Sequence, residues 1–95
     1  MTKQILRDAA ITHRECIMPP YNKFIGTDGF EAIYLFSETF SGTNIYVPSP
    51  RTIFKECIER RIVDNYNGSN IKKLACKYGF SERFIRGLLL SAGKL

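Results

Sequence analysis

The sequence has few of the residues and patterns from which enzyme active sites are built. Its only histidine, His13, lies near the N-terminus without a nucleophile motif around it, and no glycine-rich loop for phosphate is present. Glu56 and Glu59 lie one helical turn apart beside arginines, which is ordinary charge on a helix surface. The sequence therefore argues against an enzyme, and we expect no cofactor.

Cysteines are few, odd in number and widely spaced, at Cys16, Cys57 and Cys76. This pattern argues against a disulfide framework. His13 and Cys16 have a spacing found in metal sites, but no second close pair completes a site, so we expect no metal. Cys57 and Cys76 are expected to be small core residues on helical stripes.

Long apolar runs are also missing, because the longest is the five-residue segment 32–36. This run is too short to cross a bilayer, and no wide apolar helix face lies opposite a lysine-rich one as in membrane-surface helices. Asp8, Arg14 and Glu15 interrupt any apolar stretch near the N-terminus, so we expect no signal peptide. The expectation is a cytoplasmic protein without a membrane partner.

The composition is sufficient for one small domain that a partner subunit completes. The chain has 95 residues, 44% of them apolar, and a net charge of +5. From Arg51 onward there are ten Lys and Arg against four Asp and Glu, whereas before Arg51 there are four against five. This asymmetry is expected if one end of the protein meets a polyanion and the other meets protein.

Residues 69–90 organise the chain, because they predict two short helices joined by a tight turn. Ser69 or Asn70 can cap the first helix, and Ser81 can cap the second. The apolar stripe of the first helix comprises Ile71, Leu74, Ala75 and Tyr78. The second helix is expected to point Phe84, Ile85, Leu88 and Leu89 toward the interior.

The spacing of Ala75, Gly79 and Ile85 is that of a DNA-binding helix-turn-helix. A small residue lets the helices cross closely, a glycine enters the left-handed conformation at the turn, and a branched residue fills the space between the helices. The alternative is a plain helical hairpin in some other small protein. The basic bias of this half favours DNA binding.

The outward positions of the second helix are the candidate base contacts, with arginine suited to guanine and glutamate to cytosine: Ser81, Glu82, Arg83 and Arg86. The first helix and its cap supply candidate contacts to the DNA backbone: Asn70, Lys72, Lys73 and Lys77. For each charge the alternative is a solvated helix face. Gly87 is unusual inside a helix, so either something approaches closely there or the helix is weak before it binds.

Before the hairpin, the pattern predicts two helices, a strand and a third helix. The first helix covers 3–17, with a buried set of Ile5, Leu6, Ala9, Ala10 and Ile17. Asp28 and Glu31 form a capping box for the second, which continues to Phe40 and is apolar nearly all round. Such a helix needs a partner chain to cover it. Ser49 and Pro50 start the third, over 51–66, with a stripe of Phe54, Cys57, Ile58, Ile62 and Tyr66.

The strand is predicted over 43–47, where β-branched and aromatic residues alternate. A lone strand leaves its backbone unpaired, so we expect it to pair with the same strand of a second subunit. Ile45 and Val47 would face the core, and Asn44 and Tyr46 the outer side. The expected dimer interface comprises Ile33, Phe36, Phe40, Ile45 and Val47.

With the strand and the hairpin placed, the chain resembles the Mor family of phage-type transcription activators. Residues 40–48, FSGTNIYVP, are similar to the glycine-rich turn and strand of that family. Residues 70–83, NIKKLACKYGFSER, are similar to its Leu-Ala-x-Lys-Tyr-Gly-Leu-Ser-Glu-Arg segment. The family's paired glycines are Ser41 and Gly42 here, and Phe84 and Gly87 also depart from its pattern, so the operator sequence cannot be carried over.

The resemblance implies an intertwined dimer with two helix-turn-helix units on an imperfect inverted repeat, activating RNA polymerase at a promoter. It also suggests that Asn44 and Tyr46 approach the DNA backbone or minor groove, ordinary surface residues being the alternative. We expect a mostly α-helical fold, with a dimerisation region over 1–48 and a helix-turn-helix region over 49–95. Half-sites would lie about 10 bp apart or a multiple of that.

The predicted function is a homodimeric, sequence-specific regulator of transcription that binds double-stranded DNA. One alternative is an architectural or recombination protein that binds any duplex through the electrostatic contribution alone. The other is a protein–protein adaptor dimer without DNA affinity.

Overall fold

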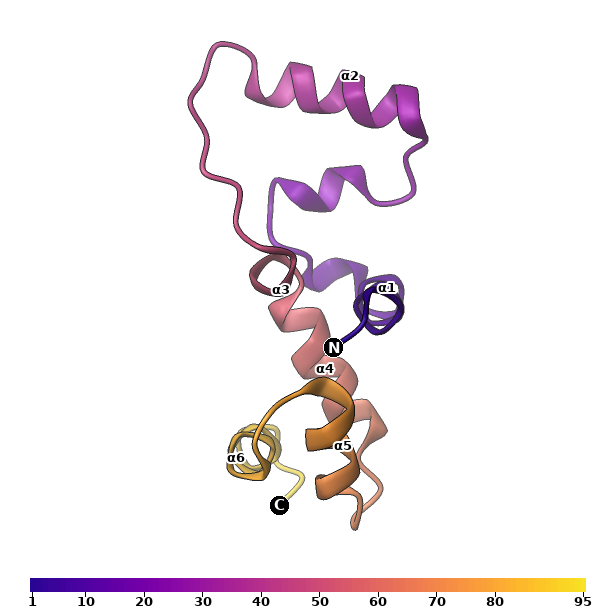
Figure 1. Cartoon of the computed structure of the whole chain (residues 1–95), viewed down its shortest axis with the longest axis vertical. Coiled ribbons are helices and arrows are strands. Elements are labelled where there is room, and N and C mark those ends of the chain that lie inside the picture. Colours follow the sequence, from indigo (N-terminus) through magenta and orange to yellow (C-terminus); the bar gives the residue numbers. More distant parts are fainter.

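A computed structural model describes all of residues 1–95. The chain is entirely helical outside its connections, which confirms the mostly α-helical class. Six α-helices and two 3₁₀ helices follow in the order α1 Lys3–Thr12, η1 Arg14–Cys16, η2 Tyr21–Phe24, α2 Gly29–Phe40, α3 Pro50–Ile53, α4 Lys55–Asn65, α5 Ile71–Tyr78 and α6 Glu82–Ser91. The molecule is elongated, 48 × 24 × 21 Å, with α2 at one end and α5 and α6 at the other (Figure 1). None of its helices is long and apolar enough to cross a membrane.

The core lies in the half built from α1, η1, α4, α5 and α6. Helix α1 packs against α4, α4 packs against α6, and α5 packs against α6. Twelve residues are buried, all from this half: Ala9, Ala10, Cys16, Ile17, Cys57, Ile58, Ile62, Leu74, Ala75, Tyr78, Ile85 and Leu89. The α5–α6 hairpin is therefore part of the packed core, whereas α2 contributes no buried residue.

Helix α1 is shorter than the predicted helix over 3–17. Thr2 caps it by accepting a hydrogen bond from the amide of Ile5, and it ends at Thr12. The Thr12 hydroxyl donates to the carbonyl of Asp8 at 2.7 Å, and His13 leaves the helical conformation. The chain then turns through η1 to Ile17, which is buried as expected.

Helix α2 begins as predicted, because Asp28 accepts a hydrogen bond from the amide of Glu31 at 2.8 Å. It packs against η2, through ring contacts of Phe24 with Phe36 and of Tyr21 with Phe40, at 6.3 and 6.2 Å between centroids. Its other faces are open to solvent. Phe30 is 78% exposed and Ile33 is 73% exposed.

The structure of the single chain shows no strand over 43–47. Residues 43–49 have no regular secondary structure, because one chain contains no second strand that could supply ladder hydrogen bonds. The helix predicted over 51–66 is interrupted at Phe54, which separates the short α3 from α4. Ser49 and Pro50 start α3 as expected, with the Ser49 hydroxyl accepting from the amide of Thr52.

Candidate nucleic-acid interface

The turn between α5 and α6 has the geometry that its spacing predicts. Gly79 has φ +75°, in the left-handed region, and its amide donates to the carbonyl of Ala75 at 2.9 Å. The amide of Phe80 donates to the same carbonyl at 3.0 Å. Ala75 and Ile85 are buried where the two helices meet. The hairpin is therefore fixed by backbone hydrogen bonds at its turn and by apolar packing at its crossing.

The four candidate base-contacting residues lie together at the exposed N-terminal part of α6. Ser81 caps the helix by accepting from the amide of Phe84 at 3.1 Å. Glu82, Arg83 and Arg86 are exposed, and a guanidinium nitrogen of Arg86 lies 3.6 Å from a carboxylate oxygen of Glu82. Arg83 makes no ion pair. Of the two arginines, only Arg83 is thus free to bind a new acceptor without losing an existing contact.

Gly87 lies on the outward side of α6, where a side-chain methyl group would meet nothing within 4 Å. Packing within the chain therefore does not require glycine here. Because this exposed position has no side chain, another molecule can approach the helix backbone closely.

Helix α5 exposes Lys72, Lys73 and Lys77 on its outer side. Asn70 does not cap this helix, which corrects one predicted cap. Its side chain instead holds the preceding turn: its oxygen accepts from the amide of Asn67 at 3.0 Å, and its nitrogen donates to the carbonyl of Asn65 at 2.8 Å.

Two other predictions for the hairpin are wrong. Cys76 is exposed rather than buried, because the α5 stripe formed by 71, 74, 75 and 78 leaves position 76 on the other side. Phe84 is 40% exposed rather than inward-facing. It stacks on Phe80, with 4.5 Å between ring centroids.

Arg51 contacts this aromatic pair from outside the hairpin, and the sequence pattern does not predict the contact. Its guanidinium carbon lies 4.8 Å from the centroid of the Phe80 ring. No spacing rule connects Arg51, in α3, with Phe80. The excess of basic residues after position 50 was the only sequence signal.

Asn44 and Tyr46 lie on the connection between α2 and α3, apart from the hairpin (Figure 1). Both are exposed, and Tyr46 is 85% exposed. The Tyr21 hydroxyl donates to the backbone carbonyl of Tyr46 at 3.5 Å. The structure thus does not bring these two residues together with the candidate contacts on α5 and α6.

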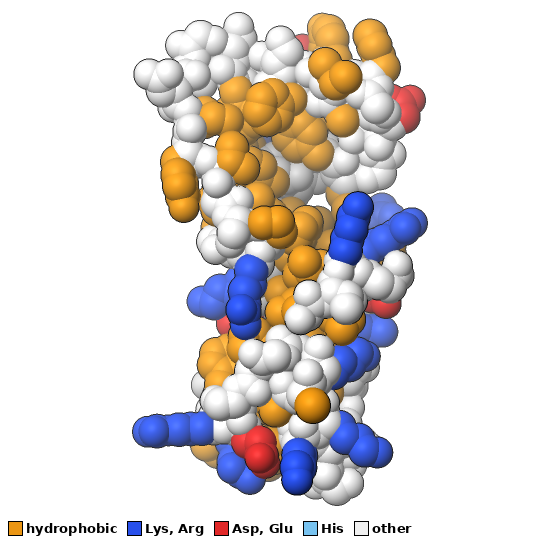
Figure 2. Space-filling model, viewed as in Figure 1, with side chains coloured by type: hydrophobic (Ala, Val, Ile, Leu, Met, Phe, Trp, Pro, Cys, Tyr) orange, Lys and Arg blue, Asp and Glu red, His pale blue; other side chains and the backbone are white.

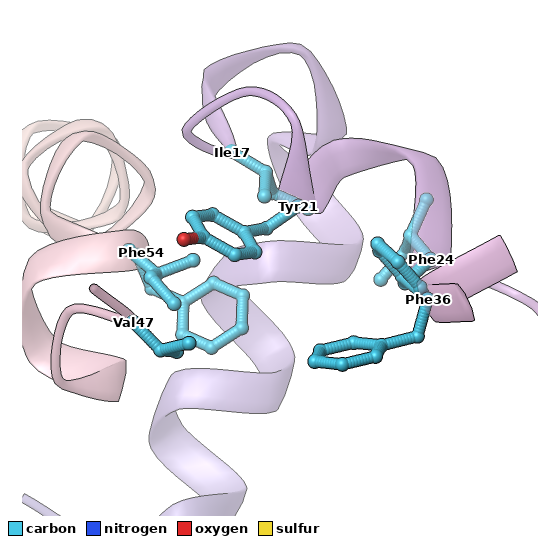
Figure 3. A pocket seen from close by; sticks show the side chains of 8 residues that line it. Ile17, Tyr21, Phe24, Phe36, Val47 and Phe54 are labelled. Carbon is cyan, nitrogen blue, oxygen red and sulfur yellow. The ribbon is translucent and has the colours of Figure 1, made fainter. Parts of the chain in front are cut away.

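The five residues expected at a dimer interface lie on α2 and the connection after it. Ile33 and Phe36 are exposed on α2, and Phe40 packs edge-on against Phe36 at 5.0 Å between ring centroids. Phe36 and Val47 line an open pocket of about 290 Å³ whose eight lining residues are all apolar (Figure 3). Ile45 is 39% exposed on the same connection. This end of the molecule is therefore apolar and incompletely covered.

A second groove, which no sequence pattern predicts, lies between α1 and the start of α3. We call it the basic groove. Its apolar walls include Leu6, Ile11 and Phe54, its volume is about 720 Å³, and no acidic residue lines it. Its cationic residues are Lys3, Arg7 and Arg14. None of the three makes an ion pair within the chain.

His13 connects the segment after α1 with η1 and α4. Its Nε2 lies 2.6 Å from a carboxylate oxygen of Asp64, and its Nδ1 lies 3.4 Å from one of Glu15. A backbone hydrogen bond and the contact with His13 lower the pKa of Glu15. Cys57 donates to the backbone carbonyl of His13 at 3.2 Å, and burial raises the pKa of Cys57 to about 11.

Basic side chains cover the half of the molecule that carries the hairpin. On the face shown in Figure 2, Lys and Arg lie over the middle and lower parts, whereas the α2 end shows apolar side chains. A capped second helix with exposed polar positions, packed across a glycine turn on a basic domain, defines a helix-turn-helix protein.

The family model described as the Mor transcription activator family matches residues 9–92. The chain belongs to this family, which confirms the resemblance noted in the sequence. Membership supports transcription regulation and DNA binding as the role of the chain. No curated protein and no solved structure matches it.

Proposed function

We propose that this protein is a homodimeric activator that binds an inverted DNA repeat through two copies of the α5–α6 hairpin and recruits RNA polymerase in the cytoplasm. The observation that carries the proposal is the exposed N-terminal part of α6, with the unpaired Arg83, in a chain of the Mor transcription activator family. Arginine matches the acceptor pair on guanine in the major groove. Lys72, Lys73 and Lys77 on α5 would hold the flanking phosphates.

The proposed dimer is supported by the complementary surfaces of α2 and the basic groove. Residues 24–50 contain no Lys or Arg, and their acids are Asp28, Glu31 and Glu38. The basic groove has apolar walls, three unpaired cations and no acid. We therefore place α2 of one subunit against the basic groove of the other, which would cover the exposed Phe30 and Ile33.

The connection over 43–47 is proposed to pair with its counterpart in this dimer. Its backbone forms no strand ladder in the single chain, and Val47 lines the apolar pocket beside α2. Antiparallel pairing about a two-fold axis would satisfy the free backbone groups. Asn44 and Tyr46 would then lie together on the outer side, where the DNA backbone is their proposed partner.

The experiment that tests the function is selection of duplexes from a random DNA pool, followed by titration of the selected duplex and a scrambled one at two salt concentrations. We expect an inverted repeat that binds at least about a thousandfold more tightly than the scrambled duplex. Equal, strongly salt-dependent binding of both would identify an architectural DNA-binding protein instead. Absence of binding to any duplex would leave the hairpin as a protein-docking surface.

Dimerisation is measured separately, by sedimentation of the protein with and without the selected duplex. A dimer on an inverted repeat binds with a stoichiometry of two chains per duplex. One chain per duplex, with a monomer in free solution, would contradict the proposed assembly even if the DNA binding were specific.

A further inference from the structure

Arg51 lies next to the N-terminal end of α6 although it belongs to a different element. It is in the first turn of α3, which Ser49 caps and Pro50 begins. Its guanidinium lies over the ring of Phe80, the residue that directly precedes the Ser81 cap of α6. The tertiary fold thus adds a cation to the edge of the hairpin from outside it.

The Arg51 side chain is held in position, but its positive charge has no acidic partner within the chain. Phe80 is fixed by its stack with Phe84, and the guanidinium 4.8 Å from the Phe80 ring makes a cation–π contact. Arg51 has no carboxylate partner, since the short contacts between basic and acidic side chains involve only His13 and Arg86 on the basic side. A stacked guanidinium keeps its in-plane N–H groups available for an oxyanion.

Lys55 lies on the same side, four residues later. Arg51 and Lys55 border a groove of about 240 Å³ together with Phe80 and Phe84 from the hairpin. Both cations are exposed. The one acid at this groove is Glu59, which is partly buried and forms no ion pair with Lys55 or Arg51. The groove therefore has a net positive rim that directly adjoins the first turn of α6.

We propose that Arg51 and Lys55 bind phosphate groups of the DNA strand that borders the bases contacted by α6. This inference rests on the proposed function, because it requires α6 to enter the major groove. When a recognition helix enters with its N-terminal end, the groove edge beside that end is a row of phosphates. Cations fixed beside Phe80 and Phe84 would face that row, so the DNA-binding surface extends beyond the hairpin to α3 and the start of α4.

The test is a titration of the full-length protein by fluorescence anisotropy, on the selected duplex and on a scrambled duplex, over a series of salt concentrations. We expect Arg51→Ala to reduce the slope of log affinity against log salt by about 1.8 on both duplexes, which is about 0.9 for each of the two subunits of the proposed dimer. Extrapolated from 1 M salt, the two lost phosphate contacts weaken binding about 60-fold at 0.1 M. The ratio of specific to scrambled affinity stays unchanged, because phosphates carry no direct sequence information.

Two further variants separate charge from packing. Arg51→Lys retains the cation without the planar stack and is expected to recover most of the salt slope. Lys55→Ala is expected to lower the slope in the same way as Arg51→Ala. The matched control is Arg60→Ala, which removes an exposed arginine whose charge acts on Glu15 and Cys16 on the other side of α4. It should leave the slope unchanged.

The outcomes distinguish this inference from the proposed function. If the unmodified protein binds no duplex, the proposed function fails. If it binds specifically but Arg51→Ala has an unchanged slope, the function stands and the phosphate contact is refuted. A loss of discrimination in Arg51→Ala without a change of slope would also refute it, because Arg51 would then act only by positioning Phe80.

Discussion

Replacing Gly87 by alanine is predicted to stabilise the free protein and to weaken its binding to DNA. The two effects have different origins. A methyl group at this position meets no atom within 4 Å, so the substitution introduces no clash in the free chain. Alanine is preferred to glycine inside a helix by about 1 kcal/mol, because glycine loses more backbone entropy on folding. For a domain of this size, about 1 kcal/mol raises Tm by roughly 4–8 °C.

The effect on binding depends on how closely DNA approaches α6. Gly87 directly follows Arg86 on the exposed side of the helix. If the helix backbone approaches base edges there, the added methyl group separates the two surfaces and weakens specific binding. We expect a loss of about tenfold or more, since losing one good base contact costs about 1–3 kcal/mol. Binding to scrambled DNA, which depends on phosphates, should change much less.

The matched control is Gly79→Ala, in the turn of the same hairpin. Gly79 has φ +75°, and a left-handed conformation costs a residue with a side chain about 1–2 kcal/mol. The two glycine-to-alanine changes should therefore shift Tm in opposite directions when compared at one fixed protein concentration.

Thermal unfolding followed by circular dichroism measures the first effect, and anisotropy titration measures the second. A lower Tm for Gly87→Ala would refute the conclusion that this side of α6 is open. A higher Tm with unchanged specific affinity would refute a close approach of DNA at Gly87, and the glycine would then serve only to keep α6 weak before binding.

Three further predictions concern base contact, dimerisation and thiol chemistry. Arg83→Ala should cost about 1–3 kcal/mol on the selected duplex and relax its specificity, and equal discrimination would contradict the groove assignment. Ile33→Asp, on the open face of α2, should raise the dimer dissociation constant at least about 30-fold, because burying an unpaired polar group costs about 2 kcal/mol or more; an intact dimer by sedimentation would contradict the proposed interface. At pH 8 an aromatic disulfide reagent should modify only the exposed Cys76 rapidly, because burial raises the pKa of Cys57 to about 11 and keeps it protonated; rapid reaction of all three thiols would contradict this.

The local features of the hairpin could be predicted because each depends on a few neighbouring residues. A serine cap at Ser81 and a left-handed glycine at Gly79 require only the hydrogen-bonding groups of the next turn. The same holds for the Asp28 cap of α2. Helical spacing also identified most of the buried positions, because the core is built from one stripe on each of several short helices.

The errors concern specific side-chain and inter-strand contacts rather than helical periodicity. The orientation of Phe84 depends on its stack with Phe80, which itself contacts Arg51 from α3. The side chain of Asn70 is engaged by Asn65 and Asn67 in the preceding turn, so it is not available as a cap. The segment 43–47 has a strand-like sequence, but a strand exists only with a partner. These contacts cannot be predicted from residue spacing or local propensity.

The distribution of burial connects assembly with DNA recognition. Only 12 of 95 residues are buried, and none of them lies between 18 and 56. The half that carries α5 and α6 is therefore packed within one chain, whereas the α2 half would gain its cover in the proposed dimer. In the proposed dimer the contacts of α2 fix the separation of the two α6 helices, and this separation must match the spacing of the half-sites. It follows that substitutions on the open face of α2, far from any base, should change the preferred spacing between half-sites, whereas substitutions at Arg83 should change the sequence within them.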